Sequence, residues 1–111
     1  MIEVIVTGGR FYEDRDKVFD VLSKLRPDLV IQGGATGADA HAKEWCDITG
    51  TKCHPEPADW TRYGNAAGPI RNGNMLRLFP NAMVVAFPGN TGTADCVRQA
   101  QGLKRIVLRV L

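Results

Sequence analysis

Residues 82–93 read Ala-Met-Val-Val-Ala-Phe-Pro-Gly-Asn-Thr-Gly-Thr, and this stretch decides the fold that the sequence predicts. Its first half, residues 82–87, is a short apolar run, partly β-branched and bounded by prolines, which is typical of a buried central strand. The residues from 94 on have the pattern of a helix. A strand that enters a helix through a glycine-rich turn leaves backbone N–H groups free at the positive end of the helix dipole. The stretch therefore predicts an anion site.

Residue types in this turn support the anion site. Gly89 and Gly92 have no Cβ, so they can adopt positive φ and let a ligand oxygen approach the main chain closely. We expect positive φ at Gly92. Thr91 and Thr93 add hydroxyl groups. The alternative is a tight turn in which the glycines serve geometry alone and nothing binds.

Glycines also end two other predicted strands. A short apolar strand at residues 28–32 runs into Gly33-Gly34-Ala35-Thr36-Gly37-Ala38-Asp39, where the next helix begins. A strand at residues 2–6 ends in Thr7-Gly8-Gly9-Arg10. Because the carboxyl ends of parallel strands share one edge of a sheet, we expect the three glycine turns to converge on one crevice.

Strands and helices alternate along the whole chain. Helices are predicted at residues 13–26, from the 33–39 turn to 49, at 70–79 and at 94–101, and strands at 2–6, 28–32, 51–54, 82–87 and 104–111. This alternation predicts the α/β class: a single Rossmann-like doubly wound domain, with a five-stranded, mostly parallel sheet and helices on both faces. Such a sheet has two open edges, and we expect a homodimer to protect them.

The composition is that of one soluble globular domain over residues 1–111. Apolar residues make up 44% and charged residues 23%, and the net charge of +2 does not by itself indicate nucleic acid. No apolar run is long enough for a membrane span and no signal-peptide pattern is present, so we expect a cytoplasmic protein without a membrane partner. Cys46, Cys53 and Cys96 lack C-x-x-C spacing, which favours reduced thiols. Neither a metal site nor a cofactor is predicted.

A long loop and the helix after it carry further candidate residues. Residues 56–68 exceed what a strand-to-helix connection needs, and the loop contains Trp60 and Tyr63, which either contact a ligand or cover the edge of the sheet. Arg71 and Asn72 follow in the first turn of the next helix. A guanidinium group there offers a planar pair of donors to a phosphate or carboxylate.

Standard catalytic and nucleotide fingerprints are absent. The chain has neither the G-x-G-x-x-G pattern of dinucleotide folds nor the G-x-x-x-x-G-K-[ST] pattern of P-loop proteins. Its one serine, Ser23, lies inside a predicted amphipathic helix. A serine hydrolase of the triad type is therefore excluded.

Four motifs, in this order, resemble the YspA-type branch of the SLOG superfamily. They are Val6-Thr7-Gly8-Gly9-Arg10, the turn at residues 33–39, the segment 58–72 that ends in Ala-Gly-Pro-Ile-Arg-Asn, and the segment 87–93. That superfamily groups DNA-processing DprA-like proteins with the Lonely Guy phosphoribohydrolases. The resemblance covers nearly the whole chain. It implies a Rossmann-like fold that binds a nucleotide or nucleotide-derived ligand at the glycine turns, often as a sensor in phage and bacterial conflict systems.

One departure from the family pattern concerns catalysis. Lonely Guy enzymes carry Pro-Gly-Gly-x-Gly-Thr-x-x-Glu with a catalytic glutamate, and the position of that glutamate is Cys96 here. Asp95 lies one residue earlier, about 100 degrees away around a helix. A thiol is a poor substitute for a carboxylate that stabilises an oxocarbenium-like centre or activates water. The departure argues against phosphoribohydrolase activity, and Asp39 or Asp95 are the catalytic candidates that remain.

Three hypotheses follow. The first is a binding module in which the glycine turns hold a phosphate with Arg10 or Arg71 as its cation and Trp60 stacks on a base. The second is hydrolysis of the N-glycosidic bond of a nucleotide by Asp39 or Asp95. The third, from the DprA-like relatives, is single-stranded nucleic-acid binding that uses Arg62 and Tyr63 in addition. The predicted ligand-binding residues are Gly8, Gly9, Arg10, Gly33, Gly34, Thr36, Gly37, Asp39, Trp60, Arg71, Asn72, Pro88, Gly89, Asn90, Thr91, Gly92 and Thr93.

Overall fold

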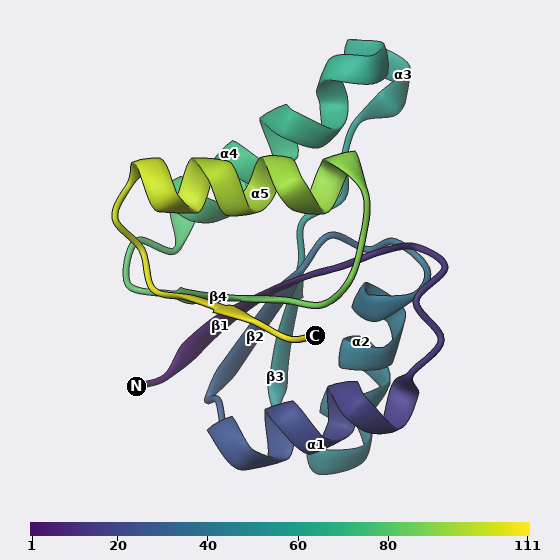
Figure 1. The fold of residues 1–111 in the computed structure, drawn as a ribbon, viewed down its shortest axis with the longest axis vertical. Coiled ribbons are helices and arrows are strands. Elements are labelled where there is room, and N and C mark those ends of the chain that lie inside the picture. The colour runs from purple at the N-terminus through teal and green to yellow at the C-terminus, as the bar shows by residue number, and fades with distance from the viewer.

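The computed structural model describes residues 1–111 and has one five-stranded sheet, in which every pair of neighbouring strands is parallel (Figure 1). The strand order is β3-β2-β1-β4-β5. The predicted α/β class and doubly wound architecture are confirmed, and the sheet is entirely rather than mostly parallel. The elements are β1 (Glu3–Thr7), α1 (Arg15–Leu25), β2 (Leu29–Gln32), α2 (Ala38–Thr49), β3 (Lys52–Pro55), α3 (Trp60–Tyr63), the 3-10 helix η1 (Gly64–Ala66), α4 (Ala67–Leu78), β4 (Met83–Ala86), α5 (Thr91–Gly102) and β5 (Val107–Arg109).

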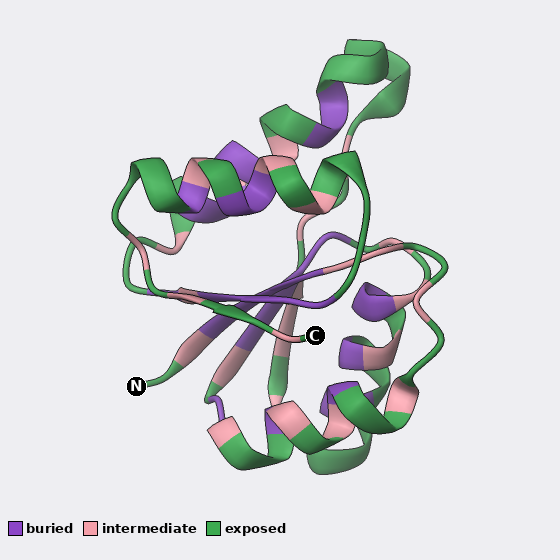
Figure 2. Ribbon diagram, in the orientation of Figure 1, coloured by how far each residue is buried: buried purple, intermediate pink, exposed green.

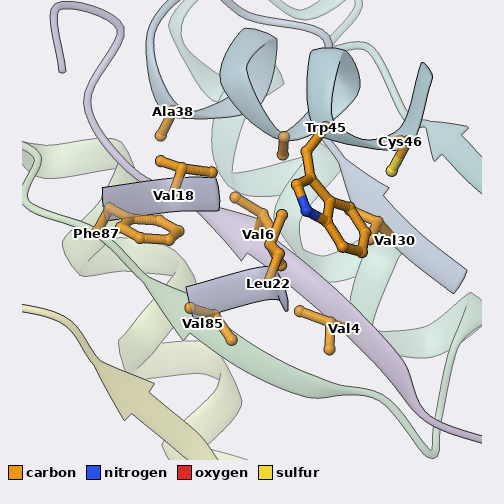
Figure 3. Packing of buried hydrophobic residues seen from close by; sticks show 11 residues of the cluster. Val4, Val6, Val18, Leu22, Val30, Ala38, Trp45, Cys46, Val85 and Phe87 are labelled. Atoms are coloured by element: carbon orange, nitrogen blue, oxygen red, sulfur yellow. The ribbon is translucent and has the colours of Figure 1, made fainter. Parts of the chain in front are cut away.

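Helices cover both faces of the sheet, with α1 and α2 on one face and α4 and α5 on the other (Figure 1). Side chains of β1 pack against the helices on both faces of the sheet, because successive side chains of a strand point to opposite faces. Val4 and Val6 pack in the cluster that includes Leu22 of α1 and Trp45 of α2 (Figure 3). Ile5 packs in the other cluster, which includes Met75 of α4.

The chain reverses its direction of winding between β1 and β4. Strand β1 leads to α1 on one face, whereas its neighbour β4 leads to α5 on the opposite face (Figure 1). The two loops therefore diverge, and a crevice opens between them at the carboxyl ends of the strands, where ligands bind in doubly wound folds.

Two helices begin earlier than the sequence pattern predicts. Helix α5 begins at Thr91 rather than at residue 94, so Gly92 belongs to its first turn. Helix α4 begins at Ala67 rather than at residue 70, with Pro69 inside its first turn. Glycine and proline do not mark the start of a helix reliably here. The N–H groups of a first helical turn have no intrahelical acceptor, so a proline in that turn removes no hydrogen bond.

The last predicted strand is shorter than expected. Residues 104–106 precede β5 because Arg105 turns back to α4, where its Nη1 donates to the carbonyl oxygens of Phe79 and Ala82, both at 3.1 Å. Lys104 has positive φ in the same turn. The guanidinium group thus caps the carboxyl end of α4.

The predicted long loop contains a short helical excursion. Helices α3 and η1 lie beyond the edge of the sheet and contain no buried residue (Figures 1 and 2). Asp59 caps α3 by accepting the N–H of Arg62 at 3.1 Å. None of the helices in the chain is long and apolar enough to cross a membrane.

Candidate functional site

A cavity of about 350 Å³ occupies the crevice between the loops that follow β1 and β4. Turns after β1, β2 and β4 all contribute to its wall, so the three predicted glycine turns do lie at one edge of the sheet. Helix α4 contributes from its second and third turns, because it begins at Ala67, so Arg71 and Asn72 are not in its first turn as predicted. The lining residues are Val6, Thr7, Gly8, Gly9, Arg10, Phe11, Gly33, Ala35, Asp39, Arg71, Asn72, Met75, Asn90, Thr91, Gly92 and Thr93.

The amino end of α5 presents unpaired donors to this cavity. The N–H groups of Thr91, Gly92 and Thr93 have no acceptor within the chain, and the first helical bond runs from Ala94 N to Asn90 O at 3.0 Å. The side chain of Asn90 does not cap the helix. Three N–H groups at the positive end of a 12-residue helix favour an anionic ligand.

Gly92 does not have the positive φ that the sequence pattern predicted. It lies in ordinary helical structure, and a Cβ at this position would meet no atom within 4 Å. The prediction failed because the two glycine turns have similar sequences but different local structures. The open space beside Gly92 belongs to the cavity that this residue lines, and the backbone of Gly92 is not strained.

The turn after β2 is the contrasting case. Asp39 Oδ2 accepts the N–H of Gly33 at 3.1 Å and that of Ala35 at 3.3 Å, and Gln32 accepts the N–H of Gly34. Gly34 and Gly37 do have positive φ here. Since side chains of the protein already occupy the amides of Gly33, Gly34 and Ala35, these three amides are not free to bind a phosphate.

Arg71 of α4 contacts the turn that follows β2. Its Nη1 donates to Gly33 O at 2.9 Å and its Nε donates to Asn72 Oδ1 at 3.0 Å. A Cβ on Gly33 would lie 2.1 Å from Nη1, so the close approach requires glycine at position 33. These contacts leave Nη2 without a partner in the chain and fix the guanidinium group at the cavity wall. Arg10, the other cation on the wall, is exposed.

Asp39 is the single carboxylate that lines the cavity. The residue is 6% exposed, and burial raises its pKa above the ordinary range, against the lowering effects of the Ala35 N–H, the Arg71 charge and the Gly33 N–H. Both amide bonds go to Oδ2, while Oδ1 has no partner within the chain. An unpartnered carboxylate oxygen on the cavity wall is suited to accept a hydrogen bond from a ligand hydroxyl or amine.

Replacing Asp39 with asparagine is expected to raise the melting temperature at pH 7 by a few degrees. Because the folded pKa of Asp39 lies above the unfolded pKa, its favourable contribution is present at low pH and lost as the pH rises through the folded pKa. Asparagine can still accept both amide bonds through its oxygen. Melting curves of both proteins between pH 3 and pH 8 should diverge as the pH rises. A variant less stable than the parent at pH 7 would contradict this assignment.

Asn72 ties the cavity wall to α5. It is 2% exposed, and its Nδ2 donates to Gly92 O at 3.2 Å and to Asp95 Oδ2 at 3.1 Å. Burial raises the pKa of Asp95, but hydrogen bonds from Asn72, Gln99 and Arg98 outweigh it and leave that pKa lowered. The carboxylate of Asp95 is therefore a fixed anion that orients Asn72.

The two catalytic candidates have different positions. Asp39 lines the cavity, whereas Asp95 does not. Cys96, which stands at the position of the Lonely Guy glutamate, is fully buried outside the wall, and burial raises its pKa to about 11. A protonated, buried thiol cannot take the role of that glutamate.

The structure brings most of the predicted ligand-binding residues together. Eleven of them line the cavity: Gly8, Gly9, Arg10, Gly33, Asp39, Arg71, Asn72, Asn90, Thr91, Gly92 and Thr93. Six lie outside it: Gly34, Thr36, Gly37, Trp60, Pro88 and Gly89. Thr36 instead donates its hydroxyl to Arg10 O at 2.8 Å and so joins the first two turns.

Five wall residues were missed by the sequence analysis, namely Val6, Thr7, Phe11, Ala35 and Met75. Val6 and Thr7 end β1, so their position beside the first glycine turn was a usable signal. Met75 follows Arg71 by four residues on α4, which places it on the same helix face. Ala35 lies inside the second glycine turn, so its position was a usable signal as well, whereas Phe11 carried none.

The aromatic residues of the excursion lie away from the cavity wall. Trp60 is 50% exposed, and its ring edge lies near Gly68 of α4. Arg62 lies over the ring of Tyr63, 5.1 Å from its centroid. The proposed stacking of Trp60 on a base would therefore need a ligand that extends beyond the cavity, or a movement of α3.

The sequence of the chain is similar to those of known proteins. The chain is 37% identical over 113 residues to the Gene 61 protein of Mycobacterium phage D29, an alignment that covers 91% of this chain and 90% of the phage protein. The model of the "YspA, cpYpsA-related SLOG family" matches residues 2–63, which include the first two glycine turns and Asp39. The chain therefore belongs to the YspA, cpYpsA-related SLOG family.

Proposed function

We propose that the protein binds a nucleotide or nucleotide-derived ligand as a sensor or binding module, with the ligand phosphate at the amino end of α5. The observation that carries the proposal is the set of three unpaired N–H groups, of Thr91, Gly92 and Thr93, at the cavity wall. Helix amino ends of this kind bind phosphate through N–H donors and the helix dipole together. Membership of the SLOG family supports a nucleotide-related ligand.

Side chains around the helix end supply the rest of the proposed contacts. Arg71 lies on the wall with a free Nη2, and Arg10 adds a second, exposed cation. Asp39 Oδ1 accepts a hydroxyl of the sugar or an amine of the base. These groups match the two ends of a nucleoside 5′-phosphate. The cations and the helix end would bind its phosphate, and the carboxylate would bind its hydroxyl groups.

Hydrolysis of an N-glycosidic bond is the second candidate function. Asp39 favours it, because a buried carboxylate with a raised pKa can act as a general acid. Glycoside hydrolysis, however, ordinarily uses two carboxyl groups that flank the scissile bond, and the cavity wall holds one. Binding without reaction is therefore the better supported function.

Thermal melting and product analysis with nucleoside 5′-monophosphates separate these functions. We expect AMP, GMP, CMP or UMP at millimolar concentration to raise the melting temperature, whereas the matching nucleosides do not, because the nucleosides lack the phosphate. Chromatography after prolonged incubation should detect no free base. Release of a base would establish the hydrolytic function, and equal stabilisation by nucleoside and nucleotide would overturn the phosphate site.

A further inference from the structure

A second hollow, of about 420 Å³, lies beside the cavity on the far side of the β4–α5 loop. It occupies the groove between α5 and the carboxyl ends of β4 and β5. Its lining residues are Ala86, Phe87, Pro88, Gly89, Asn90, Thr93, Ala94, Val97, Arg109, Val110 and Leu111. None of these residues except Asn90 and Thr93 touches the first cavity.

The amino end of α5 borders both spaces. Asn90 and Thr93 line the cavity and the second hollow alike, and they flank the free N–H groups of Thr91 and Gly92. Thr91 and Gly92 themselves line the first cavity only, so a phosphate on these N–H groups would lie in that cavity, next to the residues that border the second hollow. An organic group attached to one of its oxygens could extend into the first cavity, and a group on another oxygen could extend into the second hollow.

The ridge between the two spaces is closely packed. Gly9 N donates to Pro88 O at 2.9 Å, which fixes the β4–α5 loop to the loop after β1. A Cβ on Gly89 would lie 2.2 Å from Thr93 Oγ1 and 2.6 Å from Gly9 N, so the chain is closely packed here. Both spaces therefore exist side by side without a rearrangement of the loop.

The walls of the second hollow differ in chemistry from those of the first. Its walls are formed largely by apolar side chains, among them Pro88, Val97 and Val110, and Arg109 is the one charged residue. Unlike the first cavity, it is lined by no aspartate or glutamate side chain. Apolar walls beside one guanidinium group suit a planar aromatic group. Burial of its apolar area and contact of its ring with the cation both contribute favourable binding free energy.

We propose that the natural ligand is a phosphodiester, with a nucleoside in the first cavity and an apolar, planar group in the second hollow. This inference rests on the proposed function, because it takes the phosphate at α5 as its fixed point. It gives Pro88 and Gly89, which lie outside the first cavity, a place in the site: they form the wall that separates the two groups of the diester.

Esters of AMP test the proposal directly. The methyl and phenyl esters of AMP carry the same single negative charge, so they differ only in the group that would enter the second hollow. We expect the phenyl ester to bind about tenfold more tightly than the methyl ester in isothermal titration, because the ring buries apolar area. Equal affinities of the two esters would overturn the inference even if both bind.

A variant that fills the hollow gives an independent readout. Ala94 is an exposed residue of α5 that lines the hollow, so Ala94→Phe should fold and should abolish the tenfold preference. Gln101→Phe, at an exposed position near the other end of α5, is the matched control and should keep the preference. A preference that survives in Ala94→Phe would place the phenyl group elsewhere and overturn the inference. Failure of both esters and of AMP, GMP, CMP and UMP to bind would overturn the proposed function itself.

Discussion

Gly92→Asp is expected to reduce nucleotide binding on the order of a hundredfold, because it places a negative charge within a few ångströms of the ligand phosphate. The structure separates this loss from misfolding. A Cβ at position 92 meets no atom within 4 Å, and the residue lies in the first turn of α5. Aspartate there interacts favourably with the helix dipole, so the melting temperature of the free protein should stay the same or rise.

Gly92→Asn is the matched control for this variant, because asparagine has nearly the same shape as aspartate and no charge. We expect it to lose tenfold or less, through partial crowding of the phosphate. Isothermal titration with the best-binding nucleotide, together with melting curves of the two variants, gives the comparison. Equal affinities for the aspartate and asparagine variants would show that no anion binds beside residue 92.

Gly37→Ala is expected to cost about 3 kcal/mol of folding stability, the sum of a strained backbone and an overpacked contact. Gly37 has φ of 73°, and a Cβ there would lie 2.1 Å from Gly9 O and 2.6 Å from Arg10 C. The same contact region holds the hydrogen bond from Ala38 N to Gly9 O at 3.2 Å. Substitution would push the loop after β1 away from α2 and disturb the cavity wall, so nucleotide binding should fall as well.

Gly50→Ala is the comparison variant for a positive φ without crowding, at a left-handed position with ψ of 13°, whereas ψ at Gly37 is −128°. Gly50 ends α2 with φ of 75°, but a Cβ there would meet no atom within 4 Å. We expect a loss of about 1 kcal/mol, from backbone strain alone, and no effect on binding. Urea denaturation of both variants measures the difference. A Gly37 variant no less stable than the Gly50 variant would contradict the close packing of the two loops.

The order of strands and helices was predictable because each element is short and has one clear pattern. Residues 82–87, for instance, are a continuous apolar run between turn residues, and they contain the buried central strand β4. Parallel pairing then followed from the alternation of strands and helices, and convergence of the glycine turns followed from parallel pairing. The placement of Arg10, Arg71 and Asn72 at the same cavity is a consequence of this topology.

Features that depend on individual side chains were not predictable. The turns at residues 33–39 and 88–93 look alike in sequence, yet Asp39 and Gln32 occupy amides of the first, while the donors at Thr91–Thr93 stay free. Which amides are satisfied depends on side-chain directions that glycine spacing does not encode. Helix α3 was missed for another reason, since a four-residue helix without buried residues has no apolar periodicity.

The amide resonances of Thr91, Gly92 and Thr93 test the central claim most directly. In a ¹H–¹⁵N spectrum recorded during titration with AMP, a phosphate bound to these N–H groups should shift their proton resonances downfield, further than those of any other residues in the chain. The Gly33 and Ala35 amides, already bonded to Asp39, should move less. Saturable AMP binding that leaves the three α5 amides unmoved would contradict the account.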